Sequence, residues 1–167
     1  MVFYWPASWA RPAGGLLFGL AGVTDYFDGY LARRWQQTSN FGAFLDPVAD
    51  KLIVSTALVL LVQADPQVLL ALVAAVIIGR EITVSALREW MSQLGKRAHV
   101  AVSFFGKWKT TLQIIGIGLM LFQQRLPLVN LDSYRIGEWL LYAAGALTLW
   151  SMIEYMRAAW PILRSSD

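Results

Sequence analysis

The chain has 167 residues, of which 57% are hydrophobic and only 15% are charged. Soluble globular proteins carry about 25% charged residues, so this composition excludes an ordinary soluble domain and favours one integral membrane domain over residues 1–167. The absence of cysteine excludes disulfides and thiolate metal sites, and the net charge of +3 is assigned to cytoplasmic loops rather than to nucleic-acid binding.

Four apolar segments, and a fifth that is apolar until Thr24, are each long enough to cross a bilayer, which takes about 20 helical residues. They cover roughly 12–33, 44–64, 67–88, 100–122 and 137–157, and short polar connections separate them. The sequence therefore predicts an all-α, polytopic membrane helix bundle with five complete spans.

Basic residues gather on one side of this arrangement. That side holds Arg33, Arg34, Arg88, Lys96, Arg97, Arg157 and Arg164, whereas the other side holds only Arg11, Arg125 and Arg135. Loops rich in Lys and Arg stay in the cytoplasm, so we expect the first and last spans to end there. With a bacterial source assumed, the membrane is the inner membrane and the site opens to the cytoplasm.

The first span carries two carboxylates, Asp25 and Asp28, which share a helix face because they are three residues apart. Gly29 and Ala32 follow on the same helix and would let a ligand approach its backbone. Small residues also serve helix packing in lipid, and that alternative stays open.

The second span carries the other two carboxylates, Asp46 and Asp50, four residues apart, with Gly42 one turn before them. An unpaired Asp costs about 2.5–3.5 kcal/mol at the centre of a membrane helix, so all four must line a polar cavity or bind cations. Because both pairs flank one short turn, two antiparallel helices can bring them together. Two divalent cations would balance their charge, and an all-oxygen ligand set favours Mg²⁺ or Mn²⁺. Two such ions suit phosphoryl displacement.

The third and fourth spans carry four basic residues at their cytoplasmic ends: Arg80, Arg88, Lys107 and Lys109. Such residues form a pocket for a phosphate group or anchor the chain to anionic lipid headgroups. Glu81 is interpreted as an internal partner of a basic residue.

The stretch from Asp25 to Asp50 follows the pattern D-x2-D-G-x2-A-R-x8-G-x3-D-x3-D at all eight fixed positions. It resembles the signature of the CDP-alcohol phosphatidyltransferase family. Residues 79–82, 85–90, 94–97 and 106–111 are similar to the phosphatidylglycerophosphate synthase branch of that family. The likeness covers nearly the whole chain.

The resemblance implies a reaction that joins CDP-diacylglycerol and sn-glycerol 3-phosphate to give phosphatidylglycerophosphate and CMP. It implies a homodimer among membrane lipids. It also implies six spans per subunit, so the family's first span, which precedes the segment 12–33, is expected to be truncated here, with residues 1–6 as its tail. The roles that it implies are metal ligation by Asp25, Asp28, Asp46 and Asp50, proton abstraction by Asp50, nucleotide and diphosphate binding by Asp28, Gly29, Ala32, Arg33 and Gly42, and acceptor-phosphate binding by Arg80, Arg88, Lys107 and Lys109.

Several alternatives remain at this point. The acceptor could be inositol phosphate or serine, although the four basic residues favour a phosphorylated one. A divalent-cation transporter would need carboxylates along a path, whereas these cluster on one side. An intramembrane aspartyl protease needs two aspartates rather than four, and an inactive scaffold is the remaining possibility.

Overall fold

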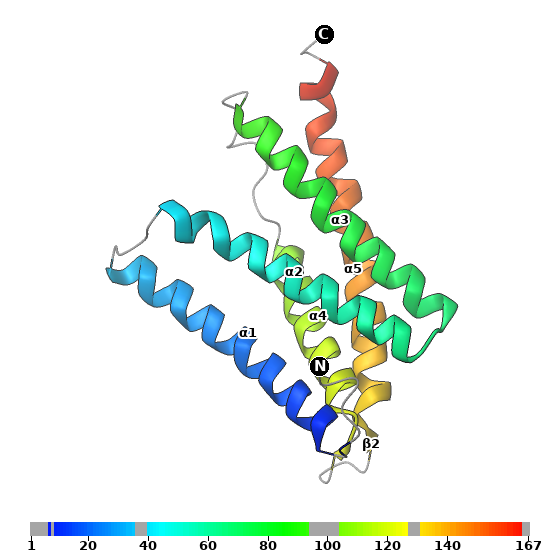
Figure 1. Ribbon diagram of the computed structural model, residues 1–167. Coiled ribbons are helices and arrows are strands. Elements are labelled where there is room, and N and C mark those ends of the chain that lie inside the picture. Colours follow the sequence, from blue (N-terminus) through cyan, green and yellow to red (C-terminus); the bar gives the residue numbers. More distant parts are fainter. Residues whose placement is uncertain (1–6, 8, 36–39, 94–103, 127–130, 165–167) are drawn as a thin grey trace.

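The computed structural model describes residues 7, 9–35, 40–93, 104–126 and 131–164. In these ranges the chain forms five helices and one pair of very short strands (Figure 1). The helices are α1 (Ala10–Trp35), α2 (Asn40–Ala64), α3 (Val68–Gln93), α4 (Phe104–Phe122) and α5 (Ser133–Arg164). The all-α prediction is confirmed, and each helix coincides with one of the five apolar segments.

The boundaries differ most at the ends of α3 and α5, which extend five and seven residues past the predicted 88 and 157, and α5 also begins early, at Ser133 instead of near residue 137. Asp132 explains the earlier start, because its Oδ1 accepts a hydrogen bond of 3.0 Å from the backbone N–H of Tyr134. A carboxylate in this position satisfies an N–H at the helix start that has no partner within the helix. Just before it, β1 (Arg125–Leu126) and β2 (Leu131–Asp132) pair in antiparallel fashion.

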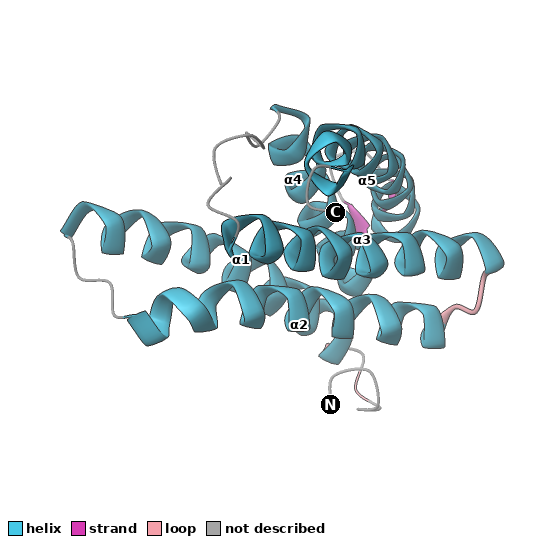
Figure 2. Cartoon of the chain, turned by 90° about the horizontal axis from the view of Figure 1, so that it is seen from above, coloured by secondary structure: helices cyan, strands magenta, loops and turns pink. Residues whose placement is uncertain are grey.

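Helices α4 and α5 form a tightly packed antiparallel pair, which α1, α2 and α3 cross at an inclination (Figure 2). Two glycines allow the close approach. A Cβ atom added to Gly116 would lie 2.9 Å from the carbonyl oxygen of Gly137, and one added to Gly137 would lie 2.6 Å from that of Gly116. Backbone therefore meets backbone at this crossing, as is common where helices associate in lipid.

The apolar core lies in the half of the bundle that contains the α2–α3 turn. Leu58 and Leu61 from α2 pack there with buried side chains from the other helices, which are Leu70, Ala74, Ile77, Ile117, Met120 and Leu141. The opposite half, where α2 begins and α3 ends, contains the polar side chains described below.

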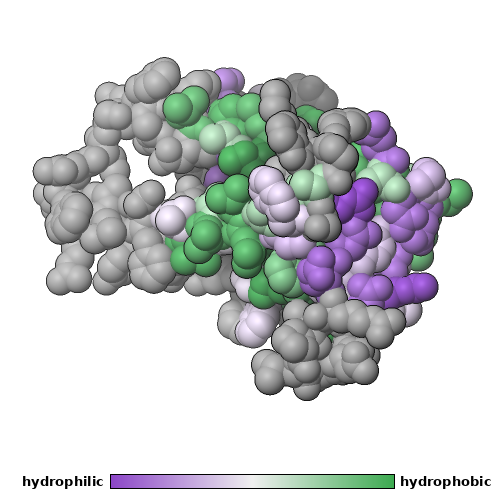
Figure 3. Space-filling model, turned by 60° about the horizontal axis from the view of Figure 1, so that its bottom comes forward, coloured by the Kyte–Doolittle hydropathy of each residue, from purple (hydrophilic) through white to green (hydrophobic). Residues whose placement is uncertain are grey.

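Large apolar side chains are also exposed on the outside of the bundle. They include Leu52 and Val59 on α2, Leu72 on α3, and Trp139 and Trp150 on α5. A lipid environment explains why so many large apolar side chains are exposed on every one of these helices. Figure 3 shows polar side chains gathered beside apolar ones at the end of the molecule where α5 begins.

Two of the helices in the described residues are long and apolar enough to cross a membrane, Val68–Gln93 and Ser133–Arg157, and Trp108–Phe122 is a shorter apolar helix. The exposed apolar surface and these helices make the chain membrane-associated. The count of five spans stays a prediction.

Candidate functional site

Both halves of the aspartate motif are helical, as the spacing argument requires. Helix α1 contains Asp25, Asp28, Gly29, Ala32 and Arg33, and α2 contains Gly42, Asp46 and Asp50. The i,i+3 and i,i+4 spacings therefore fall on helical backbone, and the prediction that each carboxylate pair shares one helix face is consistent with it.

Among the motif's side chains, the structure describes that of Asp50, which is exposed on α2. The side chains of Asp25, Asp28, Arg33 and Asp46 lie outside the described residues, as do the surroundings of Gly29, Ala32 and Gly42. Within the described part, the side chains form no group of three metal-ligating residues. Because three of the four predicted ligands are not in that part, the metal site stays a prediction.

Three charged side chains meet between α3 and α4. Glu81 accepts a hydrogen bond of 2.5 Å from Lys109 Nζ and one of 3.1 Å from Arg80 Nη1. Lys109 is only 3% exposed, so its ammonium group depends on this carboxylate rather than on water. Glu81 is thus the internal partner that the sequence predicted.

Arg80 also reaches the last helix. Its Nη2 donates to Ser151 Oγ at 3.4 Å, and the Ser151 hydroxyl donates to the Thr148 carbonyl at 3.0 Å. The Arg80 Nε atom is buried and has no hydrogen-bond partner in the described part of the chain. A buried N–H without an acceptor is costly, so this guanidinium retains capacity for another acceptor, such as a phosphate oxygen.

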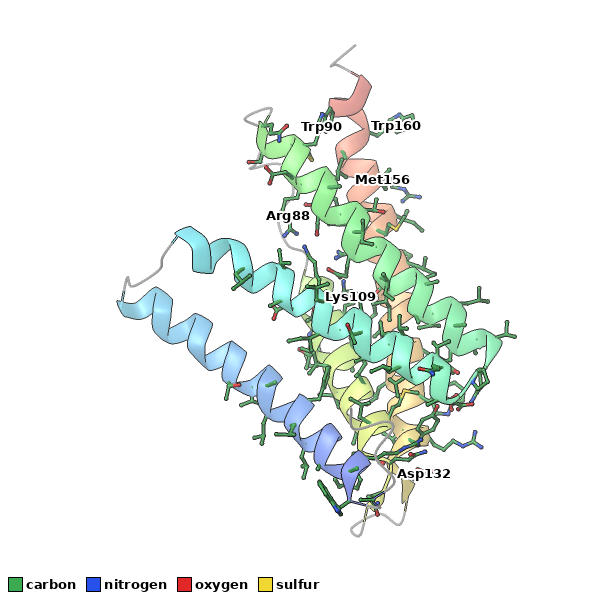
Figure 4. The ribbon with its side chains drawn as sticks, viewed as in Figure 1. Arg88, Trp90, Lys109, Asp132, Met156 and Trp160 are labelled. Carbon is green, nitrogen blue, oxygen red and sulfur yellow. The ribbon has the colours of Figure 1, made fainter. Side chains whose placement is uncertain are left out.

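Arg88 lies about two turns beyond Arg80 on α3, where its Nε donates to the Tyr155 hydroxyl at 3.4 Å. Arg88 and Lys109 extend toward each other from α3 and α4 (Figure 4), and the charges of Arg80 and Arg88 both act on Lys109. Two of these cations, Arg80 and Lys109, bond to Glu81, and the third, Arg88, lies near Lys109. This excess positive charge in an apolar setting favours the binding of an anion.

Lys51 joins this region from α2. Its Nζ donates to Ser85 Oγ at 2.5 Å, and the Ser85 hydroxyl donates to the Glu81 carbonyl at 2.6 Å. Lys51 directly follows Asp50 in the chain. The basic cluster, defined as Lys51, Arg80, Glu81, Arg88 and Lys109, therefore adjoins the helix turn that carries Asp50.

The structure brings together Arg80, Arg88 and Lys109, which the sequence had assigned to one pocket, while the side chain of Lys107 lies outside the described residues. Their role in binding a phosphate stays a prediction. Sequence reasoning missed the contributions of Lys51, Ser85, Ser151 and Tyr155. Lys51 could have been recognised, because a lysine inside an apolar span indicates a functional site. Serine and tyrosine are ordinary in membrane helices, so no sequence pattern indicated Ser85, Ser151 or Tyr155.

A cavity of about 850 Å³ lies between α1, α2, α4 and the start of α5. Its walls are mostly apolar and include Phe18 and Ala21 from α1 and Leu52 and Ile53 from α2. Ala21 precedes Asp25 by one helical turn, and Leu52 follows Asp50 by two residues. The cavity therefore begins beside the two motif segments and extends toward the opposite end of the bundle.

This arrangement, a complete eight-position motif on two helices beside a basic cluster, agrees with the comparison to known proteins. The chain belongs to the CDP-alcohol phosphatidyltransferase family, whose sequence model matches residues 1–150. Members of this family are enzymes that use a divalent metal. The transporter, protease and scaffold interpretations are therefore dropped.

Curated relatives narrow the likeness further. The chain is 49% identical over 159 residues to the CDP-diacylglycerol–glycerol-3-phosphate 3-phosphatidyltransferases of Shigella flexneri serotype 5b and Shigella boydii serotype 4, and of Escherichia coli strain K12. In each case the match covers 95% of this chain and 85% of the relative.

Proposed function

We propose that this chain transfers the phosphatidyl group of CDP-diacylglycerol to sn-glycerol 3-phosphate, giving phosphatidylglycerophosphate and CMP. The observation that carries the proposal is the 49% identity, across nearly the whole chain, to enzymes named for this reaction. The basic cluster supports a phosphorylated acceptor, because a serine acceptor would leave its excess positive charge without a partner.

The four aspartates hold two divalent cations, Mg²⁺ or Mn²⁺. Their spacing on helical backbone supports shared faces, and their oxygen-only donor set fits a hard cation. When bound, the ions neutralise charge on the diphosphate and on the departing CMP. Arg33, with the backbone around Gly29, Ala32 and Gly42 and with Asp28, binds the nucleotide diphosphate.

Asp50 accepts the proton from the acceptor hydroxyl. The hydroxyl oxygen then forms a bond to the phosphorus that carries diacylglycerol, and the bond from that phosphorus to the CMP oxygen breaks, so CMP leaves with the electron pair. The exposed position of Asp50 on α2, one residue before Lys51, supports this role because the acceptor can reach it.

Arg80, Arg88, Lys107 and Lys109 bind the phosphate of the acceptor. Arg80 offers its buried Nε and can make paired contacts to phosphate oxygens, whereas Lys109 acts as a point charge. Glu81 holds both cations in place before the acceptor arrives.

The apolar cavity beside the motif accommodates acyl groups of the lipid donor, and its volume of about 850 Å³ falls within the range of ligand pockets. The protein is an inner-membrane homodimer with its site facing the cytoplasm. The excess of Lys and Arg on that side supports the orientation.

CMP release tests the proposal. Purified protein in detergent is given CDP-diacylglycerol and Mg²⁺, with and without glycerol 3-phosphate. We expect release that needs the acceptor, stops with a chelator and returns with added Mg²⁺. Asp50→Asn should lower the rate about 100-fold or more, because a general base contributes about 10²–10⁴-fold.

The matched control is Glu89→Gln, which removes an exposed carboxylate from α3 and should leave the rate unchanged. Release with inositol phosphate but not with glycerol 3-phosphate would keep the chemistry and replace the acceptor. Release that needs no acceptor, or full activity in Asp50→Asn, would refute the proposed roles.

A further inference from the structure

We infer that Lys51 and Ser85 are positioning residues, which keep the Asp50 turn of α2 at a set distance from the acceptor-binding cations of α3 and α4. The inference rests on the proposed function, because it concerns the geometry of that site. The observation behind it is the hydrogen bond of 2.5 Å between Lys51 Nζ and Ser85 Oγ, two residues 34 positions apart.

The need for such a link follows from where α2 and α3 are otherwise held together. Their connecting turn is closed by hydrogen bonds at Asp65 and Gln67, and the apolar core contains Ala57, Leu58 and Leu61 of α2. Lys51 lies 14 residues before that turn, which is about 20 Å along a helix. The Asp50 end of α2 is therefore far from the contacts that hold α2 against α3 at their shared turn.

Packing near Lys51 is sparse, and Val54, one turn further on, is the neighbour that packs against the apolar core. Leu52 and Ile53, the next two residues, are 62% and 50% exposed, and Val48 is exposed one turn earlier. Figure 1 shows α2 and α3 diverging from their shared turn toward the start of α2 and the end of α3. Apolar contact thus contributes little at this end, and the Lys51–Ser85 link bridges the two helices where they separate.

The direction of the hydrogen bonds makes the link specific. The Ser85 hydroxyl donates its only proton to the Glu81 carbonyl at 2.6 Å, so its oxygen is left as an acceptor facing the Lys51 ammonium group. Ser85 is one turn from Glu81, whose carboxylate holds Arg80 and Lys109. Asp50 precedes Lys51 on the same turn, so the link ties the proposed base to the residues that hold the acceptor.

Loss of the link should therefore misplace Asp50 relative to a correctly bound acceptor. Errors of about 1 Å in the placement of reacting groups cost up to about 100-fold in rate. The cations that bind the acceptor phosphate keep their own partner, Glu81, so acceptor affinity should change little. The expected signature is a fall in kcat with a nearly constant KM for glycerol 3-phosphate.

Steady-state CMP release tests this signature in the full chain with Lys51→Met, Ser85→Ala and the double variant. We expect each single variant to lose about 10- to 100-fold in kcat, with KM for the acceptor changed by less than about threefold. The double variant should be no worse than the poorer single one, because both remove the same contact. Ser85→Thr and Lys51→Arg retain an acceptor and a donor and should recover most of the rate. Thr83→Ala, at an exposed position on α3, is the matched control and should behave as wild type.

Three kinetic results would overturn the inference. A raised KM in Lys51→Met together with normal kinetics in Ser85→Ala would mean that Lys51 binds the acceptor directly. Losses that multiply in the double variant, or unchanged kcat in both single variants, would mean that no shared contact positions Asp50.

A distance measurement separates this inference from the proposed function. The chain has no native cysteine, so spin labels can be placed at Val48→Cys on α2 and Glu89→Cys on α3, both exposed positions. Lys51→Met should broaden the distance distribution between the labels, and Thr83→Ala should not. An unchanged distribution overturns the link whatever the activity. Broadening in a protein whose wild type releases no CMP would support the link and refute the proposed reaction instead.

Discussion

Glu81→Gln measures how much the negative charge of Glu81, inside the basic cluster, contributes to the free energy of unfolding. Glutamine can still accept hydrogen bonds from Arg80 and Lys109, so the substitution removes charge and little else. Lys109 is 3% exposed and Glu81 is 25% exposed, so water compensates poorly for the lost charge. Removing one partner of a buried ion pair costs about 3–5 kcal/mol, and we expect about 2–3 kcal/mol here because Glu81 is partly exposed.

Thermal unfolding in detergent, followed by fluorescence of the eight tryptophans, measures the effect. A loss of about 2–3 kcal/mol corresponds to a fall in Tm of roughly 5–10 °C for a chain of this length. The matched control is Arg135→Gln, which breaks the pair between Arg135 and Glu138 at 4.0 Å, where Arg135 is 76% exposed. That exposed pair should be worth less than about 1 kcal/mol.

A second variant makes the reasoning refutable. Adding Lys109→Met to Glu81→Gln removes the unpaired cation, so Tm should return most of the way toward wild type. CMP release should stay low, because the acceptor phosphate has lost one of its cations. The electrostatic account is wrong if Glu81→Gln unfolds at the same temperature as Arg135→Gln, or if the double variant is less stable than Glu81→Gln alone.

Two further predictions concern helix packing. Gly15→Ala should lower Tm by several degrees, because its Cβ would lie 2.5 Å from the backbone nitrogen of Phe122 and overpacking costs about 1–3 kcal/mol. The control is Gly19→Ala on the same helix, where an added Cβ has no atom within 4 Å, so the substitution should be neutral or stabilising. Equal Tm values for the two variants would contradict the α1–α4 contact. Tyr134→Phe removes the 2.6 Å hydrogen bond from the Tyr134 hydroxyl to Asp65 and leaves a partly buried carboxylate with one partner fewer. The same unfolding assay should therefore show a loss of about 1–2 kcal/mol in the free energy of unfolding. A Tm unchanged from wild type would mean that this contact between the α2–α3 turn and α5 is dispensable.

Features of this protein that depend on neighbours in the chain could be predicted from the sequence. Apolar runs of sufficient length predicted all five helices, and the motif segments with i,i+3 and i,i+4 spacings fall on helical backbone, while the meeting of their carboxylates stays a prediction. The eight-position motif identified the family because all eight of its fixed positions lie within 26 consecutive residues and can be read from the chain alone. The early start of α5 was missed because the capping role of Asp132 is a single hydrogen bond, which apolar periodicity does not reveal.

The partners of the charged residues were decided only by tertiary structure. Lys109 meets Glu81 across 28 positions, Lys51 meets Ser85 across 34, and Arg80 reaches Ser151 across 71. An amphipathic pattern says which residues are polar, but the crossing of the helices decides which polar residues meet. That crossing depends on backbone contacts such as the one between Gly116 and Gly137, whose effect arises from two surfaces brought together and has no counterpart in either segment alone.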